Sequence, residues 1–153
     1  MVRLSDIPEP KRSHLRKLEC PEFRFTPWVI PPPLDRTRVA IVSTAGLHTA
    51  SDRPFHPGAA DFRVIPVDVG KGDLVMSHVS PNYDRTGFEA DRNVCFPLDR
   101  LRELESEGVI GSVARNHYSF MGATDPRAMV SFTEELMRMM REDEVTAALL
   151  VPV

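Results

Sequence analysis

Three histidines and a serine–threonine turn are the residues of this chain best suited to acid–base chemistry. His48 follows the short turn Ser43-Thr44-Ala45-Gly46-Leu47, His78 ends a second apolar segment, and His117 follows a third. Imidazole titrates near neutral pH, so it can deliver a proton to a leaving amine. We therefore predict His48 and His117 as the catalytic residues.

A second group of residues is suited to holding a small anionic substrate. Backbone donors in the 43–48 turn and the Thr44 hydroxyl can bind a carboxylate, and so can the guanidinium group of Arg92 or Arg115. The predicted substrate-binding residues are Ser43, Thr44, Gly46, His78, Arg92, Arg115 and Tyr118. Both regions also have a purely structural interpretation. The 43–48 segment is then a tight turn of small residues, and residues 91–93 are a salt-bridge cluster at the start of a helix.

Other kinds of site are not supported by the spacing. His48, His78 and His117, with Asp84 or Asp91, show no ligand-like local spacing, so we predict no metal site. The chain has neither a GxSxG elbow nor a GxGxxG or P-loop glycine pattern. These absences argue against a hydrolytic triad and against the common nucleotide-binding loops.

The two cysteines are predicted to be reduced and structural. Cys20 and Cys95 lie far apart and form no CxxC pair, which suits free thiols better than a disulfide framework. Cys95 stands between Val94 and Phe96, so we predict a small buried side chain rather than a nucleophile.

The elements that position these residues alternate between strands and helices. Strands are predicted at 38–43, 62–68, 73–78, 108–114 and 145–151, and helices at 96–111 and from Asp125 onward. This order predicts an α/β fold: a mostly parallel sheet with flanking helices, in a Rossmann-like or flavodoxin-like three-layer arrangement. Both 38–43 and 145–151 are apolar on each face, which predicts central parallel strands.

Local signals support these elements and place the site. Pro97 suits a first helical turn and Gly108 a helix end, while Asp125 and Pro126 are typical of a helix start. Pro66 suggests an edge position or a strand end. Ligands of such sheets bind at the carboxyl ends of the strands, so Gly46, His48, His78 and His117 are expected to gather at one end.

The chain is expected to consist of an N-terminal arm and one α/β domain. Residues 1–37 are predicted to be an N-terminal arm, with a short amphipathic helix within 10–20 followed by an extended proline-rich segment. Trp28, Val29 and Ile30 in that segment need a surface, which is either their own domain or another subunit. Residues 38–153 are predicted to form the α/β domain, incomplete at its C-terminal end.

Composition limits the class of protein. The chain has 153 residues, 42% hydrophobic and 27% charged, with a formal net charge of -3. This balance argues against a nucleic-acid binder, and no apolar stretch reaches the roughly 18 residues that cross a bilayer. The N-terminus has no signal-peptide pattern, so a cytoplasmic location without membrane contact is expected.

Several segments together resemble a known family. They are "TPWVIPPPLDRTRVAIVSTAGLHTASDRPF", "FRVIPVDV", "DLVMSH", "DRNVCFPLDRLRELESEGVIGSVARNHYSFMG" and "ALLVPV". They are similar to the selenoprotein B family of glycine, sarcosine and betaine reductases and to the related selenoprotein subunit of D-proline reductase. The "GLH" after the first strand, the "FPLDRLREL" helix and the "HYSFMG" turn are the most specific pieces.

The resemblance implies an oxidoreductase that reductively cleaves a carbon–heteroatom bond in a small amino-acid-like substrate. The family's redox group is a selenocysteine or cysteine with a partner thiol, and the resemblance places it downstream of the position matching Val153. Neither Cys20 nor Cys95 occupies that position, so we expect the 153-residue chain alone to be inactive. The expected partners are the substrate, a thiol electron donor and further copies in a homo-oligomer.

Two alternatives of other classes stay open. One is a non-catalytic binding or assembly subunit, which the missing redox residue favours. The other is a racemase-like or hydrolase-like α/β enzyme, for which a paired cysteine or a metal cluster would be expected in the sequence.

Overall fold

The computed structural model describes residues 3–17, 29–81 and 83–153, and it divides the chain into two compact units. In the first unit, Met1–Ile30, a short 3-10 turn η1 (Leu4–Asp6) precedes helix α1 (Lys11–Arg16), so the helix predicted within 10–20 is confirmed. The predictions for Cys20 and Trp28 concern residues outside the described part of the chain, and the boundary at residue 37 stays a prediction. Val29 and Ile30 are exposed.

The second unit, Pro31–Val153, contains the sheet and its helices. Its elements in chain order are η2 (Leu34–Arg36), β1 (Arg38–Ser43), β2 (Leu47–Thr49), β3 (Arg63–Pro66), β4 (Leu74–Met76), α2 (Thr86–Ala90), η3 (Arg92–Val94), α3 (Leu98–Ser106), β5 (Ser112–Val113), β6 (Asn116–Ser119), α4 (Pro126–Glu142) and β7 (Ala147–Val151). Every strand predicted from the sequence has a counterpart in this order.

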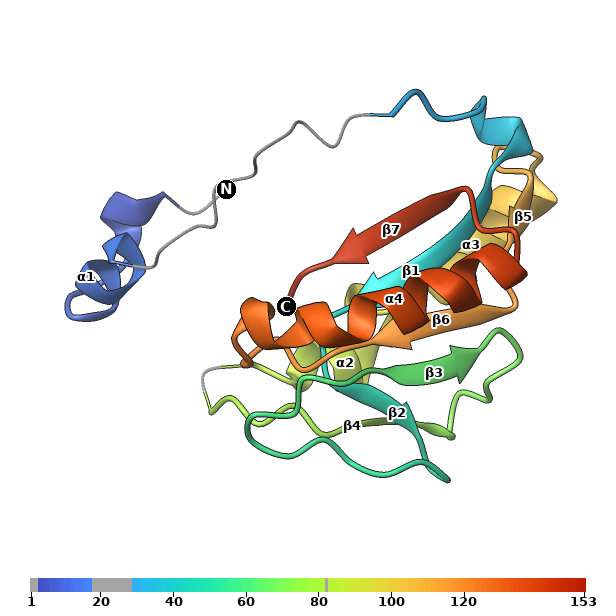
Figure 1. Ribbon diagram of the computed structural model, residues 1–153. Coiled ribbons are helices and arrows are strands. Elements are labelled where there is room, and N and C mark those ends of the chain that lie inside the picture. Colours follow the sequence, from blue (N-terminus) through green and yellow to red (C-terminus); the bar gives the residue numbers. More distant parts are fainter. Residues whose placement is uncertain (1–2, 18–28, 82) are drawn as a thin grey trace. The chain divides into compact units, whose positions relative to one another are not determined.

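Strand β1 lies at the centre of the main sheet (Figure 1). Both β6 and β7 pair with β1 in parallel at Val42 and Ser43, so they occupy opposite edges of it, and β5 pairs with β1 nearer its start. β3 runs antiparallel to β6, and β2 and β4 form a separate antiparallel pair. The fold is therefore α/β with a mixed sheet, and the prediction of a mostly parallel sheet is corrected.

The prediction that 145–151 is a central strand is wrong. β7 is parallel to β1 as expected, but in the described part of the chain it pairs with β1 alone and forms an edge of the sheet. Leu150 is 69% exposed and Leu149 is 37% exposed. An apolar run shows that a strand can be covered on both faces, but it does not say which neighbours are present.

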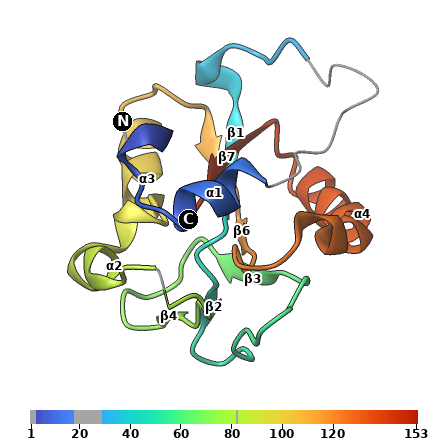
Figure 2. The same cartoon turned by 90° about the vertical axis from the view of Figure 1, so that its left-hand side faces the viewer.

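The two longest helices cover opposite faces of the sheet (Figure 2). On one face, Val39 and Ile41 pack with Leu98 and Leu101 of α3. On the other face, residues of β1 and β6 pack with Leu136, Met139 and Met140 of α4. The helix starts predicted at Pro97 and Asp125 are confirmed, and the Asp125 carboxylate accepts a hydrogen bond from the Arg127 N–H.

Residues 116–119 form strand β6 rather than the predicted turn. β5 and β6 lie on the same edge of β1, interrupted at Ala114 and Arg115. The buried carboxylate of Asp143 accepts hydrogen bonds from the backbone N–H groups of Arg115 (2.6 Å) and Asn116 (3.2 Å), which satisfies donors that the interrupted ladder leaves free. A contact from a residue 27 positions away in sequence cannot be read from local pattern.

Pro66 closes β3, and β3 lies at the other edge of the main sheet, as its proline predicted. Among the helices that the structure describes, none is both long and apolar enough to cross a bilayer.

Candidate functional site

The carboxyl ends of β1, β6 and β7 meet in one junction. The backbone N–H of Thr44 donates to the Val151 carbonyl at 3.1 Å, and the Thr44 hydroxyl oxygen accepts from the Val153 N–H at 2.8 Å. The Gly122 N–H donates to the Thr44 carbonyl at 2.9 Å. Thr44 therefore binds the segments that follow both neighbouring strands, and this is the end of the sheet where α/β proteins hold ligands.

Glycines allow the chains to approach this closely. A Cβ on Gly122 would lie 2.7 Å from the Val153 carbonyl oxygen and 2.8 Å from the Thr44 carbonyl oxygen. Gly46 has a φ of +65°, and a Cβ there would lie 3.1 Å from the backbone of His78. The structure thus brings together the predicted residues Gly46 and His78, and it identifies Gly122, which the sequence analysis did not single out.

Ser43 ties the junction to the segment around η3. Its buried hydroxyl donates to the Cys95 carbonyl at 2.9 Å and accepts from the Ala45 N–H at 3.2 Å. The Cys95 side chain is buried as predicted. Burial raises the pKa of its thiol, although a hydrogen bond from Tyr83 acts in the opposite direction. A protonated, buried thiol is a weak nucleophile.

His48 and His78 are both buried, and His78 lies against Gly46 in the turn that follows β1. The His48 ring contacts the Thr49 carbonyl through Nδ1 at 2.8 Å, and its Nε2 has no partner in the described structure. The Nδ1 atom of His78 accepts from the Ser80 N–H at 3.2 Å, and its ring lies 4.8 Å from that of Tyr83. Burial, and then the charge of Arg85, lower the pKa of His78.

His117 lies inside the sheet core. Its Nδ1 accepts a hydrogen bond from the Ile41 N–H at 3.0 Å, and its ring meets Phe96 edge to face at 5.6 Å. Burial lowers its pKa to about 4, so the ring is neutral near pH 7 with its proton on Nε2. Any proton that His117 donates at neutral pH must therefore come from the neutral imidazole.

Arg115 lies apart from the junction, whereas Tyr118 pairs with Val42 next to it. The Arg115 guanidinium pairs with Asp143 at 2.9 Å, and Asp143 also binds Arg38 at 2.8 Å, so this cluster sits where β1 begins. Burial would raise the pKa of Asp143, but the hydrogen bonds from Arg115 and Arg38 outweigh it and lower that pKa. Tyr118 is fully buried in the core on the α4 face.

Arg92 lines a cavity of about 470 Å³ next to the start of α3. Its guanidinium pairs with Asp99 at 2.8 Å, and that hydrogen bond lowers the pKa of Asp99 to about 2. Asn93 also donates a hydrogen bond to Asp99. The predicted salt-bridge cluster around residues 91–93 is therefore present. The cavity and the salt-bridge cluster share the same arginine.

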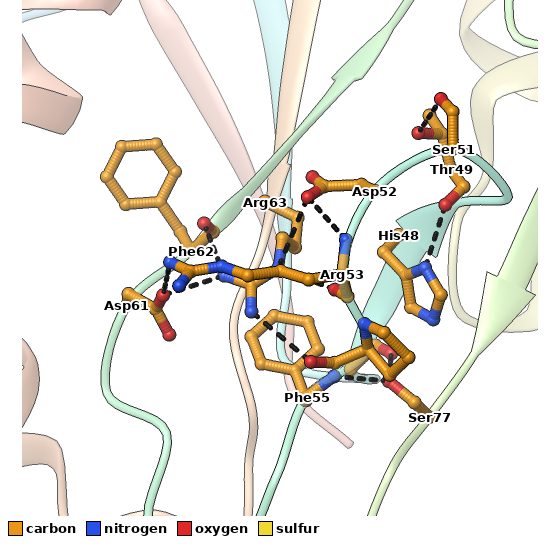
Figure 3. A network of polar contacts seen from close by, with 12 residues as sticks. His48, Thr49, Ser51, Asp52, Arg53, Phe55, Asp61, Phe62, Arg63 and Ser77 are labelled. Carbon is orange, nitrogen blue, oxygen red and sulfur yellow. Dashed lines mark hydrogen bonds and ion pairs between the residues drawn. The ribbon is translucent and has the colours of Figure 1, made fainter.

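A second polar network surrounds Arg63, which the sequence analysis missed (Figure 3). Its side chain is only 3% exposed, lies 4.3 Å from the Phe55 ring centre, and pairs with Asp61 at 2.9 Å. It also donates to the Arg53 carbonyl at 3.0 Å. Arg63 organises the 53–63 loop beside a cavity of about 330 Å³. An isolated arginine in a strand pattern gave no signal of this role.

Metal binding gains no support from the structure. Among the residues described, no group of three or more histidine, cysteine, aspartate or glutamate side chains could hold a metal ion. The backbone N–H groups of Thr44, Ala45, Gly46 and Leu47 in the turn after β1 all donate to acceptors within the protein.

Comparisons with known proteins identify the family. The family model for the glycine/sarcosine/betaine reductase selenoprotein B matches residues 33–153. D-proline reductase subunit gamma of Acetoanaerobium sticklandii is 37% identical over 117 residues, which cover 73% of this chain and 47% of that protein. The sarcosine reductase complex component B subunit beta of Peptoclostridium acidaminophilum is 31% identical over 124 residues, covering 76% of this chain and 28% of that protein.

A third relative agrees with these two. The betaine reductase complex component B subunit beta of Peptoclostridium acidaminophilum is 33% identical over 93 residues, which cover 58% of this chain and 21% of that protein. The chain spans less than half the length of each of these relatives. No solved structure shows a significant match. The resemblance inferred from the sequence is confirmed, and the chain belongs to the glycine/sarcosine/betaine reductase selenoprotein B family.

Proposed function

We propose that this chain is the substrate-holding part of a selenoprotein-B-type reductase, which reductively cleaves a carbon–heteroatom bond in a small amino-acid-like substrate. The observation that carries the proposal is the family match over residues 33–153, a range that includes the whole junction of β1, β6 and β7. The relatives are named for D-proline, sarcosine and betaine, which are all small amino-acid derivatives.

In this proposal the junction orients the substrate. The Thr44 hydroxyl holds one end of it, because this side chain lies at the carboxyl end of the central strand. His48 supplies a proton to the leaving amine from Nε2 of its protonated ring, because Nδ1 is held by the Thr49 carbonyl and Nε2 has no protein partner to displace. A selenolate or thiolate with a partner thiol, expected beyond the position of Val153, supplies the nucleophile and the two electrons.

Turnover with dithiothreitol as electron donor tests the proposal. D-proline, sarcosine, betaine and glycine are each incubated with the 153-residue chain and with a chain extended through the downstream reading frame. We expect turnover only in the extended chain, and a fall of at least about tenfold when His48→Gln is introduced there. Activity of the shorter chain that disappears in Cys95→Ser would show that the nucleophile had been misplaced.

A second candidate function is a non-catalytic assembly subunit. The names of the relatives favour it, since each is a subunit of a reductase or of a reductase complex. Under this alternative the extended chain alone is inactive, and substrate is turned over only by a complex that contains the chain and other components. An extended chain that turns over substrate without such components would exclude this alternative.

A further inference from the structure

Strand β7 has an open edge in the described part of the chain, where it pairs with β1 alone (Figure 1). The Thr44 N–H donates to the Val151 carbonyl, so Val151 and every second residue before it in the strand face β1. The backbone N–H and C=O groups of Ala148 and Leu150 therefore point to the open side. Leu149 is 37% exposed and Leu150 is 69% exposed, on opposite faces of the strand.

The sequence of this edge lacks the charges that normally protect a terminal strand. Natural sheets cover their edges or place charged side chains on them, because free backbone groups pair with other chains. Residues 145–151 contain no charged side chain, and all of them except Thr146 are apolar. Such a sequence is typical of a strand that has a neighbour on each side.

Helix α4 is incompletely covered on the side nearest to this edge. Phe132, Glu135 and Met139 line the cavity that β3 also borders, so they mark the β3 side of the helix. At about 100° per residue, Val130 and Met137 lie on the opposite flank, which is the β7 side because the sheet runs in the order β3, β6, β1, β7. These two side chains are 64% and 48% exposed. No residue of α4 is fully buried, whereas α3 buries two.

The handedness of crossover connections links the open edge to the exposed flank of α4. β6, α4 and β7 form one crossover, because β6 and β7 both run parallel to β1 and α4 lies between them in the chain. Nearly all such crossovers are right-handed, so a second one that continues outward from β7 places its helix on the same face as α4. That helix then lies beside Val130 and Met137, and its strand lies beside β7.

We propose that β7 is an inner strand of the complete reductase subunit, and that a strand–helix unit outside these 153 residues covers the open edge and the α4 flank. The strand of this unit runs parallel to β7 and pairs with the backbone of Ala148 and Leu150. An apolar face of its helix contacts Val130 and Met137. The family has chain for such a unit, because the match covers only 47% of D-proline reductase subunit gamma and 28% of the sarcosine reductase subunit. The inference rests on family membership, so the reductase chemistry proposed above can fail without affecting it.

Hydrogen exchange followed by ¹H–¹⁵N NMR tests the strand pairing. The 153-residue chain is compared with the chain extended through the downstream reading frame. We expect the amides of Ala148 and Leu150 to exchange fast in the 153-residue chain and at least about a hundredfold more slowly in the extended chain, with the Leu149 and Val151 amides protected in both. Unchanged exchange in the extended chain would overturn the proposal. Protection of Ala148 and Leu150 in the 153-residue chain would also overturn it, because a second copy or the N-terminal arm would then occupy the edge.

Substitutions test the strand and the helix contact separately. Leu150→Lys places a charge on the open edge, and Met137→Lys places one on the α4 flank. Each is expected to keep the melting temperature of the 153-residue chain within about 2 °C, and to lower that of the extended chain by at least about 5 °C, because only there is the charge buried. Val94→Lys, at a residue that is 64% exposed elsewhere in the domain, is the matched control and should be neutral in both chains.

The comparison between the two chains decides the outcome even where a variant does not fold. An extended variant that fails to fold while its 153-residue counterpart folds counts as the expected loss. Equal shifts of Leu150→Lys in the two chains would contradict the added strand, and equal shifts of Met137→Lys would contradict the helix beside α4.

Discussion

The imidazole Nδ1 of His117 accepts a hydrogen bond from the backbone N–H of Ile41 at 3.0 Å, so a side chain takes the place of a ladder carbonyl between two neighbouring strands. The ring is fully buried and rests against Phe96. Since a buried backbone N–H without an acceptor is costly, this bond links His117 to the integrity of the central strand.

Replacing His117 with leucine is expected to destabilise the protein. Leucine keeps an apolar side chain of similar size but leaves the Ile41 N–H without an acceptor, at a cost of about 1–3 kcal/mol in the free energy of unfolding. Urea denaturation at pH 7.5 measures the change. His56→Leu, at an exposed histidine, is the control and should stay within about 0.5 kcal/mol of the parent. Equal stability of the two variants would contradict the structural role.

The same histidine predicts how stability depends on pH. The folded pKa of His117 is about 4, below the ordinary value of 6.5, so the unfolded chain binds a proton first as pH falls. The stabilisation is complete above pH 6.5 and is lost as pH falls toward 4, by about 1–2 kcal/mol between pH 7 and 5. Urea denaturation across this range measures it, and His117→Leu should flatten the slope. A slope unchanged in that variant would assign the effect to His78 or another group.

How much of this could be read from the sequence depends on the distance over which each contact acts. Helix α4 and its cap at Asp125 were predictable, because the signals lie within one turn of the helix. Strand β1 was predictable from its own apolar run. The edge position of β7 was not, since strand order depends on partners far away in the chain.

The residues of the candidate site could likewise be predicted only where the signal is local in sequence. The loop after β1 and its Thr44 were predictable, because loops after buried strands commonly carry the ligand. Gly122 was not, because its role depends on contact with Thr44, which lies far away in sequence. The placement of Arg115 beside Asp143 at the start of β1, away from the junction, likewise depends on long-range pairing.

Asp143 is expected to be one of the most sensitive polar positions. Asp143→Asn removes the charge that Arg38 and Arg115 share at a carboxylate that is only 2% exposed, and we expect a loss of about 1–3 kcal/mol because both guanidinium groups keep access to solvent. The neighbouring Glu142→Gln affects only an exposed pair with Arg138 and should cost less than about 1 kcal/mol. Thermal and urea unfolding compare them. Similar losses in both variants would show that the cluster adds little to stability.

The tightest backbone approach at the junction yields the last prediction. Gly122→Ala would place a methyl group 2.7 Å from the Val153 carbonyl oxygen and 2.8 Å from that of Thr44, and both are backbone atoms that cannot rotate away. We expect a loss of about 1–3 kcal/mol, as for other overpacked sites. Gly72→Ala is the matched control, because nothing lies within 4 Å of its added methyl group, and it should be neutral or slightly stabilising. Urea denaturation gives both values, and NMR shifts at Thr44 report whether the junction opens. A Gly122→Ala protein as stable as Gly72→Ala, with Thr44 unshifted, would show that the segments after β1, β6 and β7 are not held in contact.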